Sequence, residues 1–377
     1  MSDKVNMKNI ICIAGAYLAT AIGSGFATGQ EILQFFASQG YMGLIGALIS
    51  MVLFSFLGAE VITRGRELKL KEPTRIYTFY CGKILGKFYE WFSPIFLFGI
   101  LIVMISGAGS TLTEYYGINP YLGRVLMAVA TLITVSMGLE KLVSILGRIG
   151  PVIAVFTIAV GLISLFKHFD GLSMVGEAMK NIEVTKASES PIVSGVIYNT
   201  LNIIVMIVFL TGMGASIESK KDAFWGGLLG GIVFMTAGIV MYLAMISDIG
   251  NLYMKEIPSL YLADNISPIV GVCFSVALIL GIYTTAVPLL WSVTNRIVED
   301  EHPKFKLVTT VIAILACIGG FLPFGKLVNI LYPYTGYMGL LILVCMVYKA
   351  ITCRKKSTQS QESVSYTHLT LPTKRIV

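Results

Sequence analysis

Ten apolar stretches of roughly 20 residues dominate the sequence, and about 20 apolar residues is the length that a helix needs to cross a bilayer. They lie at about 10–38, 41–63, 91–113, 119–139, 142–166, 191–215, 222–247, 267–295, 306–323 and 327–350. With 55% hydrophobic and only 13% charged residues, the chain also has too few polar side chains to cover a soluble globule. The sequence therefore predicts an all-α polytopic membrane protein of about ten transmembrane helices.

The distribution of Lys and Arg predicts the orientation of these spans. If the amino terminus is cytoplasmic, 20 of the 28 Lys and Arg residues lie in cytoplasmic segments and 6 lie outside. Positive residues favour the cytoplasmic side, so both termini are predicted to be cytoplasmic. No cleavable signal peptide is expected, because the first apolar segment is long and lacks a small-residue cleavage site followed by soluble chain.

Ten spans divide into two sets of five, and an odd number of helices in each set inverts the second set relative to the first. The long connection 64–90 is predicted to be internal and its counterpart 248–266 external, as inversion requires. The predicted organisation is a cytoplasmic amino terminus (1–9), a first five-helix repeat (10–166), an external linker (167–190), a second five-helix repeat (191–350) and a cytoplasmic tail (351–377). Residues 364–377 have no role in a ten-helix core, and we interpret them as a non-native artefact and exclude them.

The first apolar segment contains the run Ala21-Ile22-Gly23-Ser24-Gly25-Phe26-Ala27-Thr28-Gly29-Gln30-Glu31. Its full length of about 42 Å as a straight helix exceeds a hydrocarbon core of about 30 Å, so the segment must tilt or break. Glycine is a poor helix residue, and Thr28 with Glu31 has the spacing of a capping box that starts a new helix. We predict a helix broken at the glycines. The alternative is that the glycines only allow a neighbouring helix to approach closely.

The stretch GSGFATGQEILQFF, from Gly23 to Phe36, resembles the first helix of YkvI-type bacterial membrane proteins in the amino acid–polyamine–organocation (APC) superfamily, which has the LeuT-like five-plus-five fold. The resemblance extends over about residues 8–350. It implies an inverted repeat with discontinuous helices one and six and a solute held between their unwound parts. It also implies a secondary active transporter in the bacterial cytoplasmic membrane that works by alternating access.

Sodium-coupled members of this fold place an ion between carbonyls of helix one and a hydroxyl pair on helix eight. The resemblance implies an ion site at Ala19, Ile22, Gly281, Thr284 and Thr285. Carbonyl and hydroxyl oxygens suit a hard monovalent cation. The alternative is that both threonines bond to carbonyls of their own helix. Other members of the superfamily are proton-coupled, so Na⁺ and H⁺ both remain open as coupling ions.

The sixth span contains the polar cluster Tyr198, Asn199, Thr200 and Asn202. Buried amides in lipid need partners, so these side chains either join helices or contact a solute. An amino acid would fit with its carboxylate near Gly25 to Thr28 and its ammonium toward loosened carbonyls and amide oxygens. The predicted solute-binding residues are Gly23, Ser24, Gly25, Phe26, Thr28, Tyr198, Asn199 and Asn202.

Two acidic residues in apolar segments need an explanation, since an ionisable group inside a membrane is a functional hypothesis by default. Glu31 is either the capping acid or a proton carrier. Glu60 precedes Arg64 by four residues, which predicts an ordinary helix ion pair. In the tenth span Tyr332 precedes Pro333, and this kinked aromatic segment is either a gate or an interfacial packing belt.

No feature of the sequence points to catalysis. There is no nucleophile with a base, no pair of catalytic carboxylates and no metal-ligand spacing, and the six cysteines form no CxxC pair. We expect no metal, no cofactor other than a coupling Na⁺ or H⁺, and no nucleic-acid partner. The expected partners are the lipid bilayer and a small solute, an amino acid or related amine. The alternative function is a non-transporting membrane scaffold or regulatory component that keeps the fold.

Overall fold

The computed structural model describes residues 5–137, 140–299 and 302–367, and in these residues the regular secondary structure is helical. The helices are α1 Met7–Ala21, α2 Ser24–Thr28, α3 Gln30–Phe35, η1 Ala37–Met42, α4 Gly43–Leu68, η2 Pro73–Arg75, α5 Ile76–Tyr116, α6 Pro120–Ser136, α7 Glu140–Lys167, η3 Phe169–Met174, α8 Val175–Ala178, α9 Pro191–Ala215, α10 Lys220–Ile246, α11 Ile249–Leu252, α12 Pro258–Ile266, α13 Pro268–Ile297, α14 Phe305–Gly319 and α15 Phe324–Thr367.

Six of these helical segments are long and apolar enough to cross a membrane, and a bent pair around His168 would make a seventh span. The three shorter apolar helices α1, α6 and α14 fall in the other predicted spans. Each of the ten predicted apolar stretches thus contains a helix in the described residues. The multi-pass all-helical class is confirmed, while the count of ten membrane crossings stays a prediction. The end of the predicted span 119–139 lies outside the described residues.

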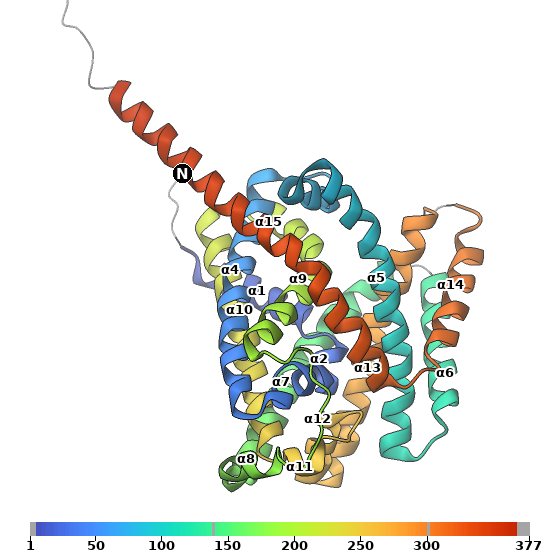
Figure 1. The fold of residues 1–377 in the computed structure, drawn as a ribbon. Coiled ribbons are helices and arrows are strands. Elements are labelled where there is room, and N and C mark those ends of the chain that lie inside the picture. The colour runs from blue at the N-terminus through green and yellow to red at the C-terminus, as the bar shows by residue number, and fades with distance from the viewer. Residues whose placement is uncertain (1–4, 138–139, 300–301, 368–377) are drawn as a thin grey trace, which may run out of the picture.

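The helices form two groups that mix the predicted halves of the chain (Figure 1). In one group α4 packs along both α9 and α10, and α1 packs along α10. In the other group α5 packs along α6 and α13, and α6 also packs against α14. Glycines allow the closest approach: a Cβ at Gly58 would lie 2.7 Å from the Gly227 carbonyl oxygen, so α4 and α10 meet backbone to backbone.

The remaining long helices repeat a packing relationship in both halves. Helix α7 packs against α1 and α13, and α15 packs against α9 and α5. If α1 corresponds to α9 and α5 to α13, these are the same pair of contacts. This pattern fits the predicted five-plus-five repeat, although the two repeats 10–166 and 191–350 interlock rather than forming separate bodies.

The connections collect at two opposite ends of the bundle, as the alternating topology predicts (Figure 1). At one end, near the amino terminus and the start of α5, Arg66 donates to the Glu218 carbonyl at 2.8 Å and Arg296 stacks over Trp91. At the other end, Tyr115 donates to the Pro268 carbonyl at 2.9 Å. The predicted tail begins inside α15, which continues to Thr367, and the last residues of the predicted artefact lie outside the described part.

The first predicted span is broken twice, which confirms its predicted discontinuity. Helix α1 ends at Ala21, and the extended backbone of Gly23 leads into the single turn of α2. Gly29 then adopts φ +82°, a left-handed conformation that favours glycine, before α3 begins. The breaks on either side of α2 place irregular backbone inside the bundle. Such backbone is tolerated within a membrane only when protein or a wet cavity surrounds it.

The predicted discontinuity of the sixth span is wrong within the described structure. Helix α9 runs without interruption from Pro191 to Ala215. It contains no glycine or proline between Gly195 and Gly212, so no residue there favours unwinding. The polar cluster bonds within the helix and to its neighbour: Asn202 donates to the Tyr198 carbonyl, and the Thr200 hydroxyl lies 2.5 Å from the Gly336 carbonyl of α15.

Candidate functional site

A cavity of about 130 Å³ lies beside the break between α1 and α2. The end of α1, the start of α2 and residues of α3, α5, α9, α13 and α15 line it. The lining residues are Ala19, Thr20, Ala21, Ile22, Gly23, Gly25, Glu31, Ile100, Met104, Leu201, Asn202, Val205, Met206, Thr285 and Tyr332. The structure thus brings together residues from three of the predicted sets, namely the solute, ion and proton-carrier candidates.

Glu31 supplies the only charged side chain among these lining residues. The residue is 8% exposed. Its Oε2 accepts a hydrogen bond of 3.2 Å from the Tyr198 hydroxyl, and its Oε1 lies so close to Gly25 that a Cβ added to Gly25 would overlap it. A carboxylate in such a place needs a proton or a cation, because a buried unpaired charge is costly.

Two further polar groups stand close to this carboxylate. The Tyr332 hydroxyl would lie 3.0 Å from a Cβ on Gly25, so Tyr332 and Glu31 approach the same glycine from α15 and α3. Asn202 reaches the cavity from α9 and donates to the Tyr198 carbonyl at 3.0 Å. Glu31, Asn202 and Tyr332 therefore supply polar groups to the cavity wall, and Tyr198 donates a hydrogen bond to the Glu31 carboxylate.

The capping-box interpretation of Glu31 is wrong. The residue that caps α3 is Gly29, which has no side chain to offer, and the Thr28 hydroxyl donates to the Gly25 carbonyl at 2.8 Å. Glu31 bonds to Tyr198 rather than returning a bond to Thr28. The left-handed Gly29 separates the two short helices. Thr28 is the last residue of α2, and its hydroxyl accepts a hydrogen bond of 3.4 Å from the Gln30 N–H at the start of α3, but Glu31 does not complete the box.

Part of the predicted ion site borders the cavity. Ala19, Ile22 and Thr285 line it, whereas Gly281 and Thr284 do not. The Gly23 N–H bonds to the Ala21 carbonyl rather than continuing the helical ladder to Ala19, which frees the carbonyl end of α1. Both threonine hydroxyls donate to the Gly281 carbonyl at 2.9 Å, which is the alternative that the sequence left open.

Phe26, Thr28, Tyr198 and Asn199, which were also predicted to bind the solute, are not among the described residues that line the cavity. Phe26 packs its ring 5.2 Å from that of Phe234, and Tyr198 lies among Phe35, Phe36 and Phe54. Asn199 is buried at 1% exposure and neither of its amide atoms has a partner among the described residues. Of Ser24 only the backbone is described, as the first residue of α2.

Sequence reasoning missed the apolar part of the lining. Ile100 and Met104 come from α5, and Leu201, Val205 and Met206 come from α9. The three-to-four-residue spacing of these side chains is the same as that of any buried helix face, so no sequence signal marks them. Tyr332 was noted as a gate or packing residue, and the structure places it in the cavity wall.

The break is covered on the side of α12 and the linker 167–190. Ser259 donates to the Ala27 carbonyl, and Ala187 donates to the Gln34 carbonyl at 3.2 Å. The cavity contacts α9 from Leu201 to Met206, in the middle of the helix and on the carboxyl side of Tyr198. The aromatic rings around Tyr198 fill the preceding turns of the same helix.

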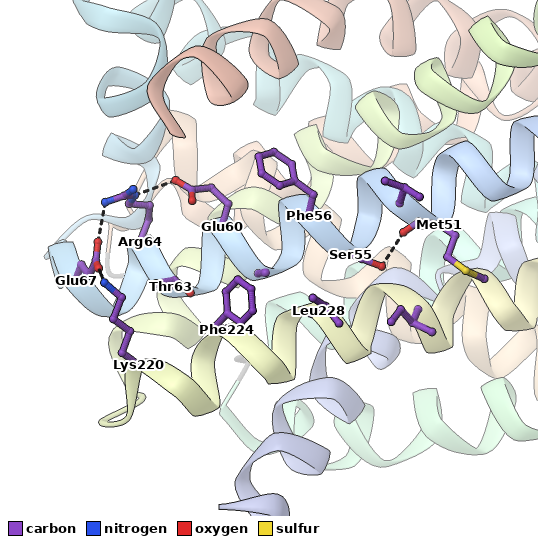
Figure 2. A pocket seen from close by; sticks show the side chains of 13 residues that line it. Met51, Ser55, Phe56, Glu60, Thr63, Arg64, Glu67, Lys220, Phe224 and Leu228 are labelled. Atoms are coloured by element: carbon purple, nitrogen blue, oxygen red, sulfur yellow. Dashed lines mark hydrogen bonds and ion pairs between the residues drawn. The ribbon is translucent and has the colours of Figure 1, made fainter. Parts of the chain in front are cut away.

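A larger groove of about 730 Å³ lies apart from this cavity, between α4 and α10 (Figure 2). A chain of ion pairs stands at one end, with Glu60–Arg64 at 2.9 Å, Arg64–Glu67 at 2.7 Å and Glu67–Lys220 at 2.5 Å. The predicted Glu60–Arg64 pair is thereby confirmed. Phe56, Phe224 and Leu228, which also line the groove, are apolar (Figure 2). The charges pair with one another and tie α4 to α10, so we do not place the solute there.

No protein-family model matches the chain. It is 23% identical over 350 residues to the uncharacterized membrane protein YkvI of Bacillus subtilis (strain 168), covering 91% of this chain and 96% of YkvI. Its structure is similar to that of MhsT in complex with L-phenylalanine, with a TM-score of 0.60 at 16% identity, over 90% of this chain and 88% of MhsT. The chain is therefore similar to YkvI over most of its length, and its fold is similar to that of MhsT. The resemblance seen in its first helix is confirmed.

The fold is also similar to that of Mhp1, a nucleobase-cation-symport-1 family transporter, in a closed conformation with bromovinylhydantoin bound. That likeness has a TM-score of 0.51 at 16% identity and covers 85% of this chain and 74% of Mhp1. At such identities the likeness shows the fold alone.

Proposed function

We propose that this protein is a secondary active transporter of a small solute, an amino acid or related amine, that works by alternating access. The observation that carries the proposal is the cavity at the α1–α2 break, because a wet or protein-lined site is where irregular backbone is tolerated inside a membrane. The long helices α5, α9, α13 and α15 converge there with α1, α2 and α3, so a movement of one helix group against the other would change access to it.

The structural neighbours support this class of function. MhsT was crystallised with L-phenylalanine, and Mhp1 belongs to a nucleobase–cation symport family. Their bound ligands, L-phenylalanine in MhsT and bromovinylhydantoin in Mhp1, are both small organic molecules. The chemistry of the solute therefore has to come from the cavity of this chain rather than from the fold.

For the coupling ion we propose Na⁺ or H⁺, each with its own residues. A sodium ion would use the carbonyl end of α1 at Ala19 and Ile22 together with the Thr285 hydroxyl, since all three border the cavity. A proton would use Glu31, whose buried carboxylate contacts the same space. Gly281 and Thr284 remain part of the sodium proposal only as supports of the α13 backbone.

We also propose that both termini are cytoplasmic and that the structure faces the cytoplasm. The covered side of the cavity carries α12 and the linker 167–190, both predicted to be external, and the cavity's lining on α9 lies on the carboxyl side of Tyr198, toward the end predicted to be cytoplasmic. The membrane in question would be the bacterial cytoplasmic membrane, and the five-plus-five inverted repeat belongs to the same proposal.

The experiment measures the thermal midpoint of the detergent-purified protein against amino acids, amines and nucleobases, with sodium or potassium and across pH. A solute at a hundredfold excess over its dissociation constant stabilises the folded state by about 2.7 kcal/mol. Hits are then tested for accumulation in proteoliposomes. A folded protein that no member of the panel stabilises would contradict the proposal and favour the scaffold alternative.

A further inference from the structure

The charge of the residues that line the cavity restricts the class of solute that can bind there. Among its lining residues Glu31 is the single ionisable acid, and no Lys, Arg or His joins it. The neutral Tyr198 hydroxyl donates a hydrogen bond of 3.2 Å to its carboxylate. Because a buried carboxylate needs compensation, this cavity favours a ligand with positive charge and disfavours one with negative charge.

The position of the carboxylate adds a second restriction. An amino acid was expected to place its own carboxylate near Gly25 to Thr28, but Oε1 of Glu31 already lies against Gly25. A solute carboxylate there would meet a like charge at close range in a poorly screened site. The chain thus supplies from Glu31 the negative group that an amino acid would bring with it.

The size and the walls of the cavity add a third restriction. Its volume of about 130 Å³ is close to the roughly 150 Å³ of an apolar cavity that binds benzene, so about six non-hydrogen atoms fit. The lining also includes aliphatic side chains and thioethers, from Ile100, Met104, Leu201, Val205 and Met206. An ammonium group on a short hydrocarbon body matches the acidic and the apolar parts of this lining.

We infer that the solute is a small protonated aliphatic amine without a carboxylate, with its ammonium bound by Glu31 and its hydrocarbon part among the side chains of α5 and α9. This inference rests on the proposed transport function and deepens it. Asn202 and Tyr332 provide additional oxygen atoms near the ammonium position. In the absence of the amine a proton neutralises Glu31, so the amine and the proton compete for one carboxylate.

The charged and titratable groups on the neighbouring elements do not take part in this competition between the amine and the proton. The elements packed against α3 are α2, η1, α9, α10, α12 and α15, and from them Tyr198 and Tyr332 face the carboxylate. Three other tyrosine hydroxyls on these elements bond elsewhere: Tyr41 to the Leu172 carbonyl, Tyr242 to the Gly40 carbonyl and Tyr261 to Asp248. On α15, Lys326 is exposed, and Lys349 stacks over Phe79.

The test uses calorimetric titration of the full-length protein with four probes. Isopentylamine is compared with isopentyl alcohol, which has the same size and no charge, and alaninamide is compared with alanine, which has a carboxylate in place of the amide. We expect isopentylamine to bind at least about tenfold more tightly than the alcohol, and alaninamide at least about tenfold more tightly than alanine. Alanine binding as tightly as alaninamide would overturn the inference.

The variant Glu31→Gln keeps the shape of the side chain and removes its charge. It should weaken isopentylamine binding by at least about tenfold and should not weaken alanine binding. Glu60→Gln is the matched control, because that carboxylate belongs to the α4 ion-pair chain and lies outside the cavity. Unchanged amine affinity in a folded Glu31→Gln protein would contradict the assignment.

A second readout needs no variant. Amine binding should release a proton from Glu31, which appears as a dependence of the binding enthalpy on the ionisation enthalpy of the buffer. Absence of proton release at every pH at which the protein stays folded would overturn the competition. If amino acids or nucleobases bind and amines do not, the inference fails while the transport proposal stands, whereas no binding by any solute contradicts both.

Discussion

Oε1 of Glu31 occupies the position at which a side chain on Gly25 would begin, although the two residues belong to different short helices. The left-handed backbone of Gly29 between them turns α3 so that its first acidic residue points back to α2. This contact places a buried carboxylate at the edge of the cavity, and it makes the glycine at position 25 a requirement of the site rather than of helix packing alone.

Gly25→Ala should impair solute binding with little loss of stability. The new methyl group meets the end of the flexible Glu31 side chain, which can move away at small cost and would then leave its place beside the cavity. We expect solute affinity to fall by about tenfold or more, the usual scale for a charge-assisted hydrogen bond. Calorimetry and the thermal midpoint measure the two effects separately.

The control for that variant is Gly15→Ala in α1, where a Cβ meets no atom within 4 Å. It should leave both the affinity and the midpoint nearly unchanged. Equal loss of binding in both variants would show that the effect is one of helix flexibility and not of the contact with Glu31.

Gly29→Ala should lower stability more than Gly117→Ala. Both glycines have positive φ, which costs an L-residue about 1–2 kcal/mol. A Cβ at Gly29 also comes within 3.0 Å of the Ser259 backbone nitrogen, whereas a Cβ at Gly117 meets nothing within 4 Å. The extra overlap adds about 1–3 kcal/mol, measurable as a lower thermal midpoint. Equal midpoints would contradict the closeness of α12 to the helix break.

Thr285→Val should weaken any stabilisation by sodium, and Thr284→Val should not. The two hydroxyls make the same 2.9 Å bond to the Gly281 carbonyl, but only Thr285 lines the cavity. The pair therefore separates ion ligation from support of the helix. The midpoint is measured against sodium concentration at constant ionic strength, and an equal response of the two variants would rule out the proposed sodium ligand.

Val205→Cys should react with a membrane-impermeant maleimide from the cytoplasmic side if the structure faces inward. Val205 lines the cavity on the carboxyl side of Tyr198 in α9. The control is Met254→Cys, a residue 76% exposed in the predicted external connection, which should react from the opposite side. Both variants need a background without native cysteines, because Cys12 and Cys273 are exposed. Labelling of both positions from one side would refute the proposed sidedness.

Local composition was sufficient to predict where the helix of the first span breaks. The glycines at 23, 25 and 29 predicted where a long apolar helix breaks, because glycine has a weak helical preference and alone tolerates the backbone of position 29. The family resemblance, by contrast, implied that α9 unwinds, and this prediction was wrong. The sequence of α9 offers no glycine or proline at the polar cluster. The more local signal was the more accurate one.

The sequence by itself determined the membrane class, the helical content, the broken first span and the Glu60–Arg64 pair, since these depend on hydropathy, on backbone preference and on neighbours within one helical turn. Only the tertiary structure decided that Glu31 bonds to Tyr198, that Asn202 but not Asn199 reaches the cavity, and that Tyr332 joins its wall. Those relationships join residues more than 100 positions apart. They depend on how α3, α9 and α15 pack, and no spacing along the chain encodes that geometry.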